Sequence, residues 1–95
     1  MKLSGRTVLV TGGTGGIGLG IAEVFYRLGS NVIFCGRARR KLLSVKEKFP
    51  GITALPCDVG DGRQRKNLAA EVLRRFPDLD IAVNNAGIQK YVDLK

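Results

Sequence analysis

The stretch Val8–Gly18 reads VLVTGGTGGIG, in which a short apolar run leads into five glycines and then into a helical pattern. Glycine tolerates a positive φ, and because it has no Cβ it allows a ligand to lie against bare peptide N–H groups. A helix that begins directly behind such a loop directs its unpaired N–H groups and the positive end of its dipole to the same place. The stretch therefore predicts an anion site, most often one for a phosphate, that is built from backbone.

The spacing of the glycines satisfies two templates. The dinucleotide fingerprint G-x-G-x-x-G starts at Gly13 and ends at Gly18, with the strand before it and the helix behind it that the fingerprint requires. The pattern T-G-x-x-x-G-x-G starts at Thr11 and ends at the same glycine. A glycine-rich turn without a ligand is the alternative. A Walker-type loop is excluded, because no Lys-Ser/Thr pair follows the glycines.

The rest of the chain alternates between apolar runs and helical patterns. Apolar residues from Ile17 to Leu28 recur at the spacing of one helix face, and Gly29 ends that helix. A second helix is expected around Leu42 and ends at Pro50-Gly51, and Asp61 caps a third that Pro77 terminates. The expected strands are residues 7–10, 31–35, 52–57 and 81–83.

These strands are solidly apolar, as is typical of a parallel sheet with helices on both faces. The chain therefore predicts one α/β domain over residues 1–95, an incomplete Rossmann-type doubly wound parallel sheet, βαβαβαβ, with strand order 3-2-1-4. Ligands of such sheets bind at the carboxyl ends of the strands. The four loops that we expect to converge there begin at Gly12, Gly36, Asp58 and Asn84.

The net charge of +8 is concentrated in residues 37–41 and 63–66. Basic clusters can bind nucleic acid, but the first begins where a strand ends near the glycine loop, which suits a bound phosphate better. The second fits a solvated helix face. We therefore expect no nucleic-acid partner.

The cysteines and the hydropathy pattern bear on the compartment. Cys35 and Cys57 end apolar strands without metal-ligand spacing, and the chain has no histidine, so we expect buried free thiols and no metal. No stretch is long and apolar enough to span a bilayer, and none resembles a signal peptide. We expect a cytoplasmic protein without a membrane partner.

The end of the second strand indicates which nucleotide is bound. In a dinucleotide fold, an acidic residue about 20 positions beyond the glycines grips the adenosine ribose. From Gly18 that count reaches Gly36-Arg37, where no carboxylate is present. A carboxylate would repel a 2′-phosphate, whereas Gly36 leaves space for one and the Arg37 guanidinium can pair with it, reinforced by Arg39 or Arg40. We therefore predict NADP(H) over NAD(H).

Four motifs in order resemble the cofactor-binding half of the short-chain dehydrogenase/reductase superfamily over all 95 residues. Within it, residues 84–90 are similar to a group of bacterial oxidoreductases. The motifs are the glycine pattern that starts at Thr11, then Gly36-Arg37, Asp58-Val59 and Asn84-Asn85-Ala86-Gly87.

The resemblance implies an oxidoreductase that transfers hydride between the nicotinamide and a carbonyl or alcohol substrate. It implies that Asp58 accepts from the adenine amino group while the Val59 amide donates to the ring, and that Asn84 tethers the central strand. Arg37 would bind the 2′-phosphate. The residues around the pyrophosphate and ribose would be Gly12, Thr14, Gly16, Ile17 and Gly18, and those along the path toward the nicotinamide would be Asn85, Ala86 and Gly87.

The resemblance also implies a catalytic Ser, Tyr, Lys and Asn, which lie well downstream in the family, and no residue here is assigned to them. Tyr91 and Lys95 fit Tyr-x-x-x-Lys literally, but they follow the fourth strand too closely to lie on the family's long helix. We therefore expect an amino-terminal, inactive part of the enzyme. A non-catalytic nucleotide-binding or regulatory module is the alternative. We also expect the uncovered fourth-strand edge to leave the chain marginally stable and to favour a homo-oligomer.

Overall fold

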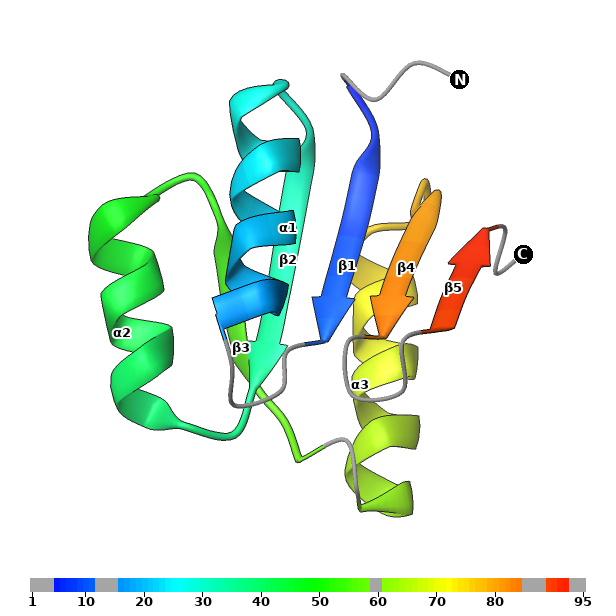
Figure 1. Cartoon of the computed structure of the whole chain (residues 1–95). Coiled ribbons are helices and arrows are strands. Elements are labelled where there is room, and N and C mark those ends of the chain that lie inside the picture. The colour runs from blue at the N-terminus through cyan, green and yellow to red at the C-terminus, as the bar shows by residue number, and fades with distance from the viewer. Residues whose placement is uncertain (1–4, 12–15, 59–60, 85–88, 93–95) are drawn as a thin grey trace.

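The computed structural model describes residues 5–11, 16–58, 61–84 and 89–92. A five-stranded sheet in the order β3-β2-β1-β4-β5 forms its centre (Figure 1). The α/β class and the predicted order 3-2-1-4 are confirmed, and one strand is added. The elements are β1 (Thr7–Thr11), α1 (Gly16–Arg27), β2 (Asn31–Gly36), α2 (Arg39–Lys48), β3 (Thr53–Pro56), α3 (Gly62–Arg75), β4 (Ile81–Asn84) and β5 (Gln89–Val92).

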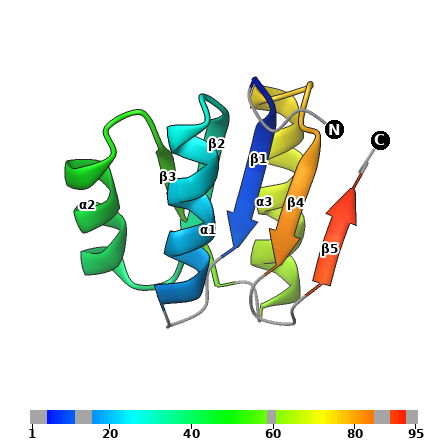
Figure 2. The same cartoon turned by 45° about the horizontal axis from the view of Figure 1, so that its top comes forward.

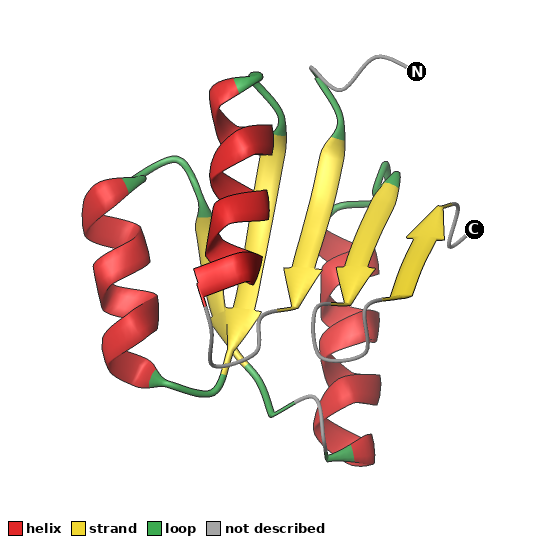
Figure 3. Cartoon of the chain, in the orientation of Figure 1, coloured by secondary structure: helices red, strands yellow, loops and turns green. Residues whose placement is uncertain are grey.

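The strands β1 to β4 are parallel, and helices cover both faces of the sheet. Figures 1 and 2 show α1 and α2 on one face and α3 on the other, and Figure 3 shows the same layers by type of element. The side chains of β1 to β4 alternate between the two faces. Val8 and Val10 pack toward α1 and α2, whereas Leu9 between them packs toward α3. Because both faces are buried, the strands read as continuous apolar runs.

The third strand is shorter than predicted. The apolar run 52–57 suggests a strand throughout, but β3 covers only Thr53–Pro56. Ile52 and Cys57 at its ends are buried at 4% and 6% exposure without pairing as strand residues. The apolar pattern therefore indicates which residues are buried. Burial extends one residue beyond the paired residues of β3 at each end.

The helices end where the sequence predicts. At the end of α1, Gly29 has φ +87°, Ser30 N–H donates to Phe25 at 3.0 Å and Gly29 N–H donates to Tyr26 at 3.1 Å, which is the Schellman arrangement. The caps of α2 and α3 are Phe49 and Phe76, and each precedes a proline. The residue before a proline is disfavoured in helical conformation, so both helices stop there.

The prediction of an uncovered β4 edge is wrong. β5 pairs with β4 antiparallel, with Ile81 opposite Val92 and Asn84 opposite Gln89. Four residues separate the two strands in the sequence. Association through the β4 edge therefore loses its basis. A homo-oligomer stays a prediction and needs another surface.

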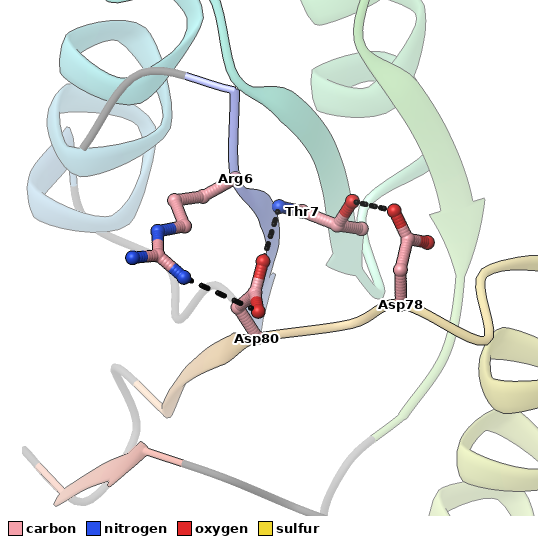
Figure 4. A network of polar contacts seen from close by, with 4 residues as sticks. All are labelled: Arg6, Thr7, Asp78 and Asp80. Atoms are coloured by element: carbon pink, nitrogen blue, oxygen red, sulfur yellow. Dashed lines mark hydrogen bonds and ion pairs between the residues drawn. The ribbon is translucent and has the colours of Figure 1, made fainter. Parts of the chain in front are cut away.

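A polar network lies at the amino ends of the strands, where β1 begins and just before β4 begins (Figure 4). Asp80 accepts from the Thr7 N–H at 3.3 Å and pairs with Arg6 at 3.5 Å, while its own N–H donates to the Thr7 carbonyl at 3.0 Å. The buried Thr7 hydroxyl donates to Asp78 at 3.2 Å. The network ties the α3–β4 connection to the first strand, about which the sheet is organised.

Candidate nucleotide-binding site

The carboxyl ends of β1 to β4 lie side by side, and we call this row of strand ends the carboxyl edge of the sheet. The helices α1, α2 and α3 begin at the same edge (Figure 1). Register places Thr11 of β1 between Cys35 of β2 and Asn84 of β4. The structure thus brings the described starts of the predicted loops to one edge. Of the predicted site residues, it describes Gly16, Ile17, Gly18, Arg37 and Asp58, and the remainder lie outside the described residues: Gly12, Thr14, Val59, Asn85, Ala86 and Gly87.

The first turn of α1 contains no acidic residue and a buried glycine. Gly16 begins the helix, and no carboxylate of that turn offsets the positive end of the dipole. Gly18 is buried, as expected of a glycine that lets a helix pack closely on a strand. Next to this helix start, the Thr11 hydroxyl donates to the Val83 carbonyl at 3.3 Å and joins β1 to β4.

Arg37 and Asp58 lie next to each other at the ends of β2 and β3. The Arg37 Nη1 is 3.9 Å from the Asp58 Oδ2, and the two side chains are 70% and 37% exposed. The strands beneath them are joined, because Cys57 N–H donates to the Gly36 carbonyl at 2.9 Å. The residue that we expect to hold a 2′-phosphate and the residue that we expect to hold the adenine are therefore already paired.

The backbone of Asp58 is held by α3, through a residue that sequence reasoning missed. The Asp58 N–H donates to the Gln64 side-chain oxygen at 2.9 Å, and its carbonyl accepts from Asp61 N–H at 3.0 Å. Asp61 in turn caps α3 and accepts from the N–H groups of Arg63 and Gln64. The signal was present, because Asp61-x-x-Gln64 has capping-box spacing. Gln64 uses that position to reach back to Asp58.

Gly36 is not required by the protein's own packing. A Cβ there would lie 3.8 Å from the Phe34 ring and 3.9 Å from Leu42, which is ordinary contact. Among the described glycines only Gly5 and Gly29 have a positive φ. Neither the backbone conformation nor the core therefore explains why position 36 lacks a side chain.

The start of α2 carries positive charge and has no acidic residue in its first turn. Ala38 at the N-cap provides no side-chain hydrogen bond, and no acidic residue lies in the first turn. Arg39 and Arg40 open the helix and are exposed. A cation at a helix N-terminus is unfavourable to the helix dipole, so a bound anion here would relieve both.

The thiols near this edge are unsuited to nucleophilic chemistry. Cys35 and Cys57 are free and buried on the α3 face, as predicted. Burial, followed by the nearby Cys57 and Glu71, raises the pKa of Cys35 to about 12, and burial also raises the pKa of Cys57. The thiolate is the reactive form, so both remain inert thiols near neutral pH.

Tyr91 lies on β5, opposite Ala82 of β4, and not on a helix. Lys95 lies outside the described residues. The literal Tyr-x-x-x-Lys match therefore starts on a strand. Separately, none of the described helices has the length and apolarity needed to cross a membrane.

Comparison with known proteins agrees with this geometry. Residues 6–95 match the short chain dehydrogenase family. The oxidoreductase DltE of Bacillus subtilis (strain 168) is 46% identical over 95 residues, which are 100% of this chain and 38% of that protein. The L-fucose dehydrogenase of Bos taurus is 40% identical over 86 residues, which are 90% of this chain and 32% of that protein.

A solved short chain dehydrogenase from Mycobacterium smegmatis superposes with a TM-score of 0.77 at 28% identity, over 88% of this chain and 37% of that one. The chain thus spans between 32% and 38% of the length of these relatives. The resemblance of residues 84–90 to bacterial oxidoreductases is consistent with the match to DltE. The ordered motifs, the sheet order and these matches agree, and the chain belongs to the short chain dehydrogenase family.

Proposed function

We propose that residues 1–95 form one NADP(H)-binding domain of an oxidoreductase that transfers hydride between nicotinamide C4 and a carbonyl or alcohol carbon. The relatives' names, oxidoreductase and dehydrogenase, support a redox reaction. The nicotinamide coenzyme supplies the hydride chemistry when bound, and the protein positions coenzyme and substrate. The free buried thiols support a reducing compartment, and we propose the cytoplasm.

In this proposal each loop binds a different part of the coenzyme. The glycine-rich segment and the start of α1 hold the pyrophosphate and ribose through Gly12, Thr14, Gly16, Ile17 and Gly18. The loop after β3 holds the adenine through Asp58 and Val59. The loop after β4 lines the path toward the nicotinamide through Asn85, Ala86 and Gly87.

The observation that carries the choice of NADP(H) is the end of β2. Arg37 is exposed there, and Gly36 before it has no structural need to be glycine. A guanidinium can form two charge-assisted hydrogen bonds with a phosphate. The exposed Arg39 and Arg40 at the uncapped start of α2 support the same preference.

Binding of both coenzymes to Arg37→Ala tests the proposal. A hydrogen bond to a charged group contributes about 1.5–3 kcal/mol, so we expect the affinity for NADP⁺ to fall by about tenfold or more. The affinity for NAD⁺ should change by less than about twofold, because NAD⁺ has a hydroxyl in place of the phosphate. Calorimetric titration gives both constants.

Arg27→Ala is the matched control, since Arg27 is also exposed and ion-paired but lies at the far end of α1. It should leave both affinities unchanged. Equal losses for NADP⁺ and NAD⁺ in Arg37→Ala would contradict the role of Arg37 in choosing the coenzyme.

No residue of this chain is proposed as catalytic. An acid must come within hydrogen-bond reach of the reacting oxygen, and the family's tyrosine acts from a helix whereas Tyr91 lies on β5. In the enzyme that contains these residues, Tyr91→Phe should leave NADPH oxidation with a panel of carbonyl compounds unchanged. Loss of turnover with intact NADP⁺ binding would assign Tyr91 a catalytic role after all.

A further inference from the structure

Arg37 and Asp58 form an ion pair where β2 and β3 end. Resting on the proposed function, we propose that Asp58 limits the preference for a 2′-phosphate by competing with that phosphate for the Arg37 guanidinium. The contact that motivates this is the 3.9 Å approach of Arg37 Nη1 to Asp58 Oδ2. Asp58 is then a specificity-determining residue in addition to its proposed contact with adenine.

In the proposed competition Asp58 stays in place and Arg37 changes partner. The backbone of Asp58 is held on both sides, by Gln64 at its N–H and by Asp61 at its carbonyl. Arg37 carries a long side chain that is 70% exposed, and it follows β2 directly. A ligand that needs the guanidinium must therefore draw Arg37 away from Asp58 or share it.

The strands do not depend on the ion pair for their alignment. Gly36 pairs with Pro56 in the sheet, and Cys57 N–H donates to the Gly36 carbonyl. Removal of the Asp58 charge should therefore leave the backbone under both side chains in place. A change in coenzyme affinity can then be attributed to charge.

The charge acts unequally on the two coenzymes. A phosphate monoester carries between one and two negative charges near neutral pH, so it must compete with the Asp58 carboxylate for Arg37 and is repelled by it. A 2′-hydroxyl is neutral and meets neither effect. The carboxylate at Asp58 therefore weakens binding of NADP⁺ relative to NAD⁺.

Asp58→Asn isolates this effect, because it removes the charge and keeps both the size and an oxygen acceptor for the adenine amino group. Exposed ion pairs are worth little, so we expect the affinity ratio of NADP⁺ over NAD⁺ to rise by about two- to fivefold. The rise should be smaller at high salt, where exposed charges are screened. In the Arg37→Ala background the rise should be smaller, because only the direct repulsion between the carboxylate and the phosphate is then removed.

Glu23→Gln is the matched control. Glu23 forms an ion pair with Arg27 at 2.8 Å within α1 and takes no part in the site, so the ratio should stay unchanged. Calorimetric titration of the wild-type protein, Asp58→Asn, Arg37→Ala, the double variant and the control with NADP⁺ and NAD⁺ provides all the constants.

The titrations distinguish a failure of this inference from a failure of the proposed function. Binding of both coenzymes with a ratio that is unchanged or lowered in Asp58→Asn would overturn the inference alone. An equal rise without Arg37 would also overturn it, because the charge would then act without the guanidinium. If the wild-type protein bound neither coenzyme, the proposed function would be wrong and the inference would fall with it.

Discussion

Gly51 leaves room for the ring of Tyr26. A Cβ at position 51 would lie 2.8 Å from the Tyr26 Cε1, closer than real contacts allow. That ring packs edge-on against Phe49, with centroids 5.4 Å apart. Gly51→Ala therefore requires the outer part of the half-buried ring to shift, and we expect the free energy of unfolding to fall by about 1 kcal/mol. Urea unfolding measures this.

Gly20→Ala is the control for Gly51→Ala, because a Cβ at Gly20 meets nothing within 4 Å and the residue lies inside α1. Alanine is the better helix former, so this variant should gain about 0.5–1 kcal/mol. If both variants changed stability alike, the contact with Tyr26 would not be the cause.

The raised pKa of Cys35 predicts that the free energy of unfolding falls at alkaline pH. Its pKa is raised from 9.0 to about 12, chiefly by burial and then by Cys57 and Glu71. From about pH 9 to 12 the folded chain keeps a proton that the unfolded chain loses, so the Cys35 contribution is complete below pH 9 and is lost as the pH rises toward 12. The slope from this group approaches about 1.4 kcal/mol per pH unit.

Cys35→Ala should therefore lose less stability than the wild-type protein between pH 9 and pH 10.5, about 1 to 2 kcal/mol less. Urea unfolding at the two pH values gives the difference, in which the constant loss of packing from the substitution cancels. Parallel losses in the two proteins would show that the thiol does not titrate as its burial indicates.

Among the elements, α3 and its N-cap hold the backbone of Asp58 through Gln64 and Asp61. Asp61 accepts from the N–H groups of Arg63 at 2.9 Å and Gln64 at 3.2 Å. Asp61→Ala should lower the free energy of unfolding by about 1 kcal/mol, because it removes the N-cap. Asp61→Ser keeps a cap and should restore most of that loss. Thermal unfolding compares the two, and an unrescued Asp61→Ser would argue against capping.

The connection from α3 to β4 is tied to β1 by Asp80. Asp80→Ala removes the acceptor of the Thr7 N–H and the partner of Arg6. We expect a loss of about 1–3 kcal/mol, since Thr7 is buried and its N–H loses a partner. Glu23→Ala breaks an exposed pair and should cost less than about 1 kcal/mol. Equal losses in denaturant unfolding would contradict a structural role for the network.

At the scale of the whole molecule, the parallel sheet could be predicted because its cause is local in sequence. Continuous apolar runs such as Val8–Val10 signal a strand buried on both faces, and Gly29 and the two Phe-Pro pairs mark where helices end. These signals also predict that the loops after the strands lie together at the carboxyl edge of the sheet, which is the region of the candidate site.

The remainder depends on contacts between distant residues. β5 has only Tyr91 and Val92 as strand formers, and its place is determined by antiparallel pairing with β4. The Arg37–Asp58 pair joins residues that follow different strands, and the Asp80 network joins residues 74 positions apart. No local pattern encodes such pairs, although the capping-box spacing could have pointed to Gln64.

In the proposed function a nicotinamide nucleotide binds at the carboxyl edge of the sheet. Titration of the protein with NADP⁺, followed by amide NMR spectra, tests this residue by residue. We expect the amide signals of Gly18, Arg37 and Asp58 to move, while those of Thr7 and Asp80 at the opposite edge stay in place. Unchanged spectra at saturating NADP⁺, or changes centred on the Thr7–Asp80 edge, would contradict the account.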